Sequence, residues 1–165
     1  NHAPTIEELR KFDIIANATG ASSYVPPVFG NGARVIPFEQ VLACPKIKCE
    51  FNPGGRKMAQ LGEKVLVWGD HYAAVDTAQF LASIGKKVTV VTENPQFGST
   101  VETIHMYVAR KRFNLEEAEA LEPKPYKYRV DIMESTTVLE IGEGKVIVQN
   151  KNFEKIELEI DSVVT

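Results

Sequence analysis

Six residues beginning at Gly69 have the types and spacing of a phosphate-binding turn. They read Gly69-Asp-His-Tyr-Ala-Ala74 and follow the apolar run 65–68. In such a turn the first glycine makes the bend and the second lets the backbone approach a pyrophosphate. The third, or an alanine, lets the helix pack closely on the strand. Gly69 and Ala74 suit the first and third roles, whereas His71 stands in the place of the second glycine.

His71 changes the chemistry of the turn in one of two ways. Its Cβ and ring take up space in which phosphate oxygens normally meet bare backbone, and this closes the site. Alternatively, an imidazolium beside the exposed N–H groups of a helix start attracts the anion. Asp70 opposes binding in either case, because a carboxylate repels a pyrophosphate. The residues of the turn leave both interpretations open.

Glu93 is the second candidate binding residue. It lies 24 residues after Gly69, at the end of the next β-branched run, 87–92. An acid at this position of a βαβ unit accepts hydrogen bonds from ribose hydroxyls. No arginine or lysine occurs in 93–97 to hold a 2′-phosphate, so the sequence favours NAD(H) or ADP over NADP(H). The alternative is an exposed loop acid that meets no ligand.

The remaining candidates have structural explanations that are as good or better. Tyr72 stands where a side chain can approach a nicotinamide, but packing at a helix start explains it equally well. His105 lies between apolar neighbours, as a structural histidine does. Cys44 and Cys49 have neither the spacing of a zinc site nor that of a redox pair. We therefore expect no catalytic residue and no metal site in this chain.

The elements around these residues predict a strand-helix-strand unit followed by an antiparallel meander. Strands are expected at 12–19, 65–68, 88–92, 128–133, 137–141, 145–149 and 156–160, and an extended segment at 34–38. Helices are expected from Thr5, where Glu8 completes a capping box, at 39–43, at 72–84 with Gly85 closing it, and at 100–113. Val101, Ile104 and Val108 form the expected inner face of the last helix, and its basic end, 110–112, forms a solvated face.

Composition excludes several classes of partner. The net charge is −3 and the pI is near 5.7, so no general attraction to nucleic acid or to an anionic membrane is expected. No apolar run reaches the length of a membrane span, and the N-terminus does not have the pattern of a signal peptide. We expect a cytoplasmic protein. The final residues read as the start of a strand, which is typical of a piece of a longer protein.

The βαβ unit, together with Asp13-Ile-Ile-Ala-Asn-Ala-Thr-Gly20, resembles a known family. It is the pyridine-nucleotide-disulfide oxidoreductase type, in which an NAD domain is inserted into an FAD domain. Ala18-Thr-Gly-Ala21 matches the ATG motif at the crossover between the two. The resemblance implies that residues 1–62 form an edge of the FAD domain and a linker, 63–160 the inserted Rossmann-like NAD domain, and 161–165 the return strand.

Within this family the chain is most similar to NADH:flavin oxidoreductases fused to an old-yellow-enzyme-like barrel. The resemblance implies that Thr19 and Gly20 border FAD, and that FMN and an iron–sulfur cluster belong to a missing barrel. The chain would then bind NADH for hydride transfer to flavin in the intact enzyme and be inactive alone. Its partners would be a dinucleotide and the rest of its own polypeptide. The alternative is a structural or ADP-holding module that transfers nothing.

Overall fold

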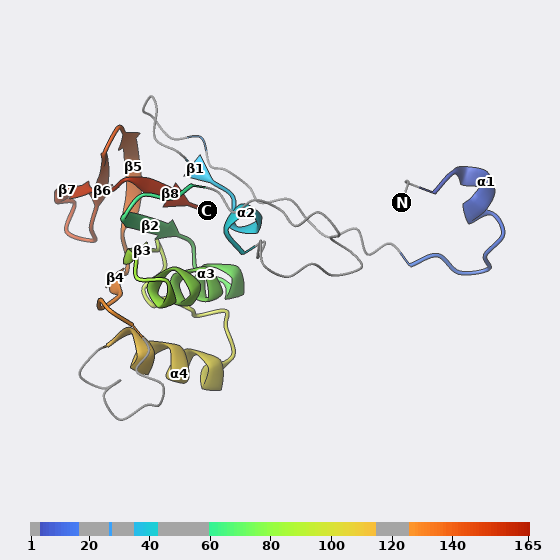
Figure 1. The fold of residues 1–165 in the computed structure, drawn as a ribbon, viewed down its shortest axis with the longest axis horizontal. Coiled ribbons are helices and arrows are strands. Elements are labelled where there is room, and N and C mark those ends of the chain that lie inside the picture. Colours follow the sequence, from blue (N-terminus) through green and yellow to red (C-terminus); the bar gives the residue numbers. More distant parts are fainter. Residues whose placement is uncertain (1–3, 17–26, 28–34, 43–59, 115–125) are drawn as a thin grey trace.

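The computed structural model describes residues 4–16, 27, 35–42, 60–114 and 126–165. Its helices are α1 (Ile6–Leu9), α2 (Phe38–Leu42), α3 (Tyr72–Ser83) and α4 (Thr103–Phe113). Its strands are β1 (Val35–Ile36), β2 (Lys64–Trp68), β3 (Lys87–Val91), β4 (Asp131–Met133), β5 (Thr137–Gly142), β6 (Lys145–Gln149), β7 (Lys155–Glu159) and β8 (Ser162–Val164). Figure 1 shows α1 apart from the sheet and its helices.

A parallel sheet organises the molecule. Its strand order is β1-β8-β2-β3-β4, and each neighbouring pair is parallel. In β2 and β3, Lys64 pairs with Lys87 and Trp68 with Val91, so the two strands end at the same edge. The residues that follow them, from Gly69 and from Thr92, therefore start side by side.

Helices α3 and α4 cover one face of the parallel sheet. The antiparallel strands β5, β6 and β7 form a meander on the opposite face (Figure 1). Val65 and Val67 of β2 are buried against the helices, whereas Leu66 is buried in a cluster with Val146 and Val148 of the meander. A strand that is covered on both faces needs apolar residues on both, as in 65–67. The three layers confirm the predicted α/β fold, a Rossmann-like parallel sheet with an antiparallel meander.

One ion pair ties the two sheets together at their ends. Lys64 at the start of β2 binds Glu159 at the end of β7. This hydrogen bond and the positive charge beside it lower the pKa of the Glu159 carboxyl. The same contact raises the pKa of Lys64.

The predicted helix 72–84 is confirmed as α3, including its end. Gly85 has φ 81°, and its N–H donates to the carbonyl of Ala82 while that of Lys86 donates to the carbonyl of Leu81. This pair of bonds is a Schellman motif, which satisfies the last carbonyls of a helix. The capping box of α1 is confirmed too, because Thr5 and Glu8 each accept a bond from the other's backbone N–H.

The expected inner face of the last helix is wrong for Ile104 and Val108, whereas Val101, which precedes the helix, is buried as expected. The helix begins at Thr103 instead of residue 100, because the Glu102 carboxylate caps it by accepting bonds from the N–H groups of Ile104 and His105. This start sets the rotation of the helix, so that Met106, Ala109 and Phe113 are buried. Ile104 is 72% exposed and Val108 is 38% exposed.

Two predicted strands differ from the structure. Residues 12–16 of the predicted strand 12–19 form no strand, and Phe12, Ile14 and Ile15 are exposed; 17–19 lie outside the described residues. A strand needs a paired neighbour, and none of the described strands lies beside this segment (Figure 1). The strand predicted at 128–133 is shortened to β4, because the N–H of Val130 donates to Phe113 at the end of α4.

The first and last described segments of the sheet pack into the same body as the central unit. β8 lies between β1 and β2, and Phe38 and Val41 of α2 share a buried cluster with Ala74 and Val65. The division at residues 62 and 160, with flanking FAD-domain segments, stays a prediction about a longer protein. In the part of the chain that the structure describes, no helix is long and apolar enough to cross a membrane.

Candidate functional site

The glycine turn between β2 and α3 is closely packed. Gly69 has φ 154° and donates its N–H to the carbonyl of Val91 at 3.1 Å. A Cβ built on Gly69 would lie 3.4 Å from the Cβ of Ala74 and 3.4 Å from Cζ of Phe38. Ala74 is fully buried. Gly69 and Ala74 thus have the geometry that the first and sixth positions of the turn require.

The start of α3 presents free donors beside this turn. His71 is the N-cap residue, and its side chain makes no capping hydrogen bond. Within the described residues, no acceptor reaches the N–H of Tyr72 or of Ala73. Unpaired N–H groups at a helix start carry the positive end of the helix dipole and suit an anion. The residues present therefore fit a phosphate group at this position.

The His71 ring lies back against the turn. It contacts Phe38 edge-on, with ring centroids 5.2 Å apart, and its Nε2 lies 3.8 Å from the position that a Cβ on Gly69 would take. The residue is exposed, and its φ of −124° is ordinary extended backbone. The ring therefore lies beside Gly69 and Phe38, and both interpretations of His71 stay predictions.

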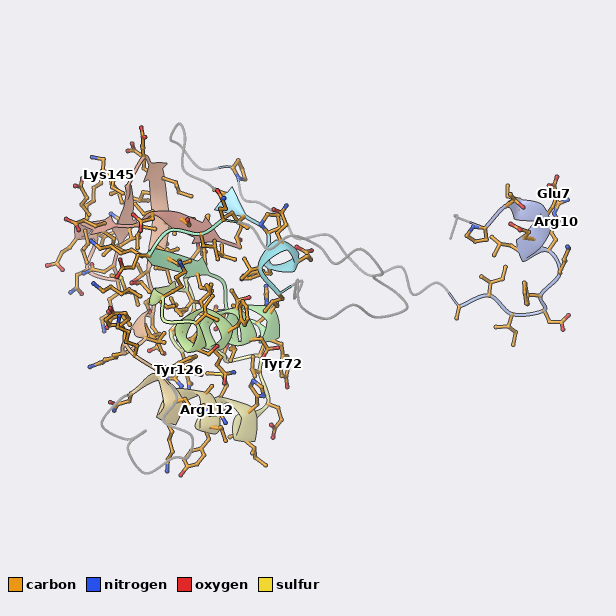
Figure 2. All side chains as sticks on the ribbon, in the orientation of Figure 1. Glu7, Arg10, Tyr72, Arg112, Tyr126 and Lys145 are labelled. Carbon is orange, nitrogen blue, oxygen red and sulfur yellow. The ribbon has the colours of Figure 1, made fainter. Side chains whose placement is uncertain are left out.

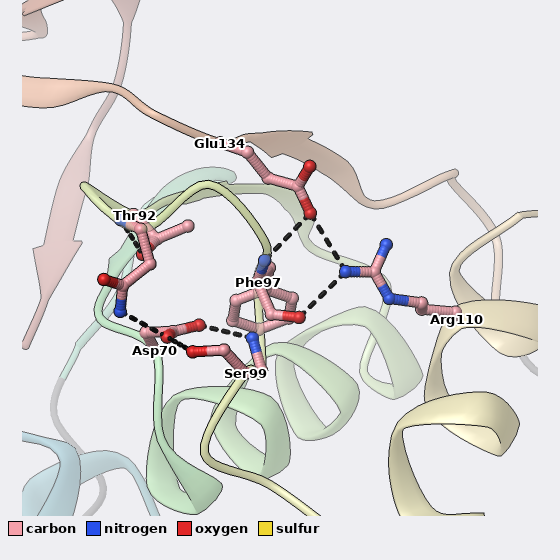
Figure 3. A network of polar contacts seen from close by, with 8 residues as sticks. Asp70, Thr92, Phe97, Ser99, Arg110 and Glu134 are labelled. Carbon is pink, nitrogen blue, oxygen red and sulfur yellow. Dashed lines mark hydrogen bonds and ion pairs between the residues drawn. The ribbon is translucent and has the colours of Figure 1, made fainter. Parts of the chain in front are cut away.

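Asp70 does not direct its carboxylate freely into the turn. One carboxylate oxygen accepts the N–H of Gly98, and the other accepts Nδ2 of Asn94 at 2.6 Å and Oγ of Ser99 at 2.9 Å (Figure 3). The backbone carbonyl of Asp70 accepts Oγ1 of Thr100 at 3.0 Å. The residue that we expected to repel a phosphate is therefore bound to the loop that follows β3.

A second acid holds the same loop from the other side. Oε1 of Glu134, directly after β4, accepts the N–H of Phe97 at 2.8 Å and the guanidinium of Arg110 at 2.9 Å. Arg110 also donates to the carbonyl of Phe97 at 2.8 Å (Figure 3). The predicted solvated face at 110–112 is thus wrong for Arg110, whose guanidinium is taken up by this network.

Sequence reasoning missed four residues of this network: Asn94, Ser99, Arg110 and Glu134. They come from three segments, and their spacing along the chain follows no motif. One signal in the sequence could have found Glu134, because acids that follow parallel strands lie at the same edge of the sheet.

Glu93 lies at this edge, two residues after β3, and it is exposed. Among the described residues nothing donates a hydrogen bond to its carboxylate. Since Val91 pairs with Trp68, Glu93 follows β3 beside the glycine turn. This is the position that the prediction requires, and a contact with ribose stays a prediction.

Tyr72 points toward α4 (Figure 2). Its hydroxyl accepts the N–H of Glu102 at 3.0 Å, and its ring meets His105 edge-on at 5.6 Å. Nε2 of His105 lies 3.5 Å from Oδ1 of Asp76. These contacts support the packing interpretation of both aromatic residues.

Four residues considered above lie outside the described part of the chain: Thr19, Gly20, Cys44 and Cys49. Within that part, no three His, Cys, Asp or Glu side chains gather as a metal site would require. The prediction of Thr19 and Gly20 beside FAD stays untested by the structure.

Among the described residues, two cavities lie near α4, and the second is lined in part by the loop that Asp70 binds. One of about 460 Å³ is lined by Phe113, Asn114, Arg129 and neighbours, and one of about 340 Å³ by Ser99, Met106, Tyr107 and neighbours. Arg110 lines both. Near the first, burial raises the pKa of the Tyr126 hydroxyl and Arg112 beside it opposes the rise.

Comparison with known proteins relates the same segment to a family. Residues 64–113, which run from β2 to α4, match the family described as pyridine nucleotide-disulphide oxidoreductase. No curated protein sequence matches the chain.

Solved structures share the fold. The flavoprotein disulfide reductase RclA from Escherichia coli superimposes with a TM-score of 0.55 at 23% identity, over 88% of this chain and 27% of that one. Bacillithiol disulfide reductase from Staphylococcus aureus gives 0.52 at 20% identity, over 64% of this chain and 28% of that one. A 2-naphthoyl-CoA reductase gives 0.52 at 24% identity, over 64% of this chain and 14% of that one. The matched part covers 14–28% of the length of these proteins, and the likeness shows their Rossmann-like fold.

Proposed function

We propose that this chain is a nucleotide-binding part of a larger flavin-dependent oxidoreductase and that it binds NADH for hydride transfer to flavin. The observation that carries the proposal is the edge shared by β2 and β3. It combines a glycine turn with N–H groups at Tyr72 and Ala73 and a Glu93 carboxylate that have no partner among the described residues. The family match over 64–113 supports it.

Each part of this edge suits one part of a dinucleotide. The N–H groups of Tyr72 and Ala73 would donate to a pyrophosphate, and Glu93 would accept hydrogen bonds from ribose hydroxyls. Because no basic residue occurs in 93–97, a 2′-phosphate would meet the negative charge of Glu93 unopposed. The bound nicotinamide would supply the hydride, and the chain would position it.

A second candidate function is that of a structural module, which holds ADP or no nucleotide and transfers no hydride. Two observations favour it. His71 stands where a second glycine would leave the backbone bare, and its ring lies beside Gly69. The Tyr72 side chain is bound to α4 instead of facing the turn. In this case the nicotinamide half would find no partner.

The rest of the enzyme carries the chemistry in this proposal. FAD would lie beside Thr19 and Gly20, and FMN and an iron–sulfur cluster would belong to an old-yellow-enzyme-like barrel elsewhere in the polypeptide. The similarity of fold to a 2-naphthoyl-CoA reductase is compatible with this group. We propose a cytoplasmic location, and that the chain is inactive without its partner domains.

Calorimetric titration of the full chain with NADH, NADPH and ADP at one ionic strength tests the proposal. We expect NADH to bind with micromolar affinity and NADPH much more weakly. Equal affinity for ADP and NADH would favour the second candidate, because the nicotinamide half would then add nothing. Absence of binding by all three would overturn the proposal for this chain.

A further inference from the structure

The loop that follows β3 is attached to both neighbouring strand ends. Asp70, in the turn after β2, accepts three hydrogen bonds from Asn94, Gly98 and Ser99. Glu134, after β4, accepts the N–H of Phe97 between them. Figure 3 shows the loop between these two acids. Its backbone position therefore depends on both of them.

The residues before and after Glu93 in the sequence are both held by backbone hydrogen bonds. Before it, the N–H of Thr92 donates to the carbonyl of Met133, and the carbonyl of Thr92 accepts the N–H of Thr136. After it, the carbonyl of Asn94 accepts the N–H of Ser135, and its side chain binds Asp70. The carboxylate of Glu93 itself has no partner among the described residues, so this backbone sets the place from which it reaches a ligand.

The three donors also change what Asp70 does to an anion. A carboxylate that accepts hydrogen bonds on both oxygens has its charge compensated by their dipoles and directed away from the turn. The repulsion expected of an acid beside a pyrophosphate is thereby reduced. Asp70, the second residue of the turn, can thus contribute to the site by holding the loop, without contact with the nucleotide.

We propose that Asp70 is a positioning residue of the nucleotide site, which acts by holding residues 94–99 so that Glu93 faces the ribose. This inference rests on the proposed function. It makes Asp70, through Glu93, a determinant of the preference for a free 2′-hydroxyl over a 2′-phosphate. Asp70 touches no reacting atom in this role.

A double-mutant cycle on the full chain tests the inference. Affinities for NADH and NADPH are measured by calorimetry for the wild type, Asp70→Ala, Glu93→Ala and the double variant. We expect each single variant to bind NADH about tenfold more weakly, the scale of one hydrogen bond to a charged group. The double variant should lose no more than either single one, because Asp70 acts through Glu93. The preference for NADH over NADPH should narrow equally in all three.

Asp76→Ala is the matched control, since Asp76 is an acid of the same helix region that contacts His105 and not the loop. It should keep the affinity of the wild type. Asn94→Ala and Ser99→Ala remove donors from the loop side and leave the turn intact, so they test the same contact if Asp70→Ala does not fold. Each should weaken NADH binding severalfold.

The outcomes separate the two proposals. If the wild type binds NADH and Asp70→Ala binds it equally well, the role of Asp70 is overturned and the proposed function stands. Additive losses, about a hundredfold in the double variant, would also overturn it. If the wild type binds no nucleotide, the proposed function fails and the inference fails with it.

Discussion

At the scale of single residues, the turn and the acid beside it make opposite contributions to binding. The Glu93 carboxylate is exposed and unpaired in the described part of the chain, so it is free for a ligand. The His71 ring lies beside Gly69 and contacts Phe38. Two substitutions measure these contributions separately.

Glu93→Ala should weaken NADH binding by about 1–2 kcal/mol, the scale of a hydrogen bond to a charged group. NADPH binding should change less, because its 2′-phosphate gains from the loss of a negative charge. Calorimetric titration measures both. Glu143→Ala, which removes an exposed acid from the turn between β5 and β6, is the control. Unchanged affinity for NADH would remove Glu93 from the site.

His71→Gly should tighten NADH binding severalfold, because it bares the backbone at the third position of the turn, where the second glycine of the motif stands. The same titration measures the effect, with circular dichroism as a check on folding. Weaker binding by the variant would show the reverse, that the imidazole contacts the phosphate.

At the scale of elements, capping and loop anchoring decide how α4 meets the turn. Glu102 caps α4 with its carboxylate and donates its N–H to Tyr72 on α3. Arg110, two turns further along, reaches the loop after β3 and Glu134. The position of α4 is therefore coupled to the same loop that Asp70 holds.

Glu102→Ala should lower the free energy of unfolding by about 1 kcal/mol, as expected for the loss of an N-cap side chain. The backbone bond to Tyr72 is unaffected, so the loss reports the cap. Urea denaturation followed by circular dichroism measures it, and Glu143→Ala again serves as the control. Equal stability of the variant and the wild type would show that water replaces the cap without cost.

At the scale of the whole molecule, β2 joins the two buried clusters. Val65 and Val67 belong to the helical side, and Leu66 belongs to the side of the meander. β3 and β8 contribute to both clusters in the same way, so the layers share the central strands and we expect them to unfold together.

Leu66→Ala should lower the free energy of unfolding by about 2–5 kcal/mol, because Leu66 is fully buried and its removal leaves a cavity. Urea denaturation should show a single transition at a lower midpoint. Leu42→Ala, at a residue 37% exposed, is the matched control and should cost much less. Two separate transitions would show that the meander unfolds by itself.

Sequence patterns predicted the parts of the fold that depend on local order. The β2–α3–β3 unit, its Schellman end and the three meander strands follow from apolar periodicity and turn residues. The strand at 12–16 and the inner face of α4 were wrong, because the first needs a neighbouring strand and the second depends on where Glu102 starts the helix. Pairing with a distant strand leaves no mark in a local pattern, and glutamate is not among the residue types that usually mark a helix N-cap.

The candidate site likewise has a part that local sequence determines and a part that depends on the tertiary structure. By itself the sequence determined that Gly69, Ala74 and Glu93 follow adjacent strands, because a strand-turn-helix-strand order brings their ends together. Only the tertiary structure decided what Asp70 binds, where Tyr72 points and that Arg110 and Glu134 hold the same loop. The physical reason is that a hydrogen bond between residues 24–37 positions apart depends on the packing of whole elements, whereas a turn depends on its own few residues.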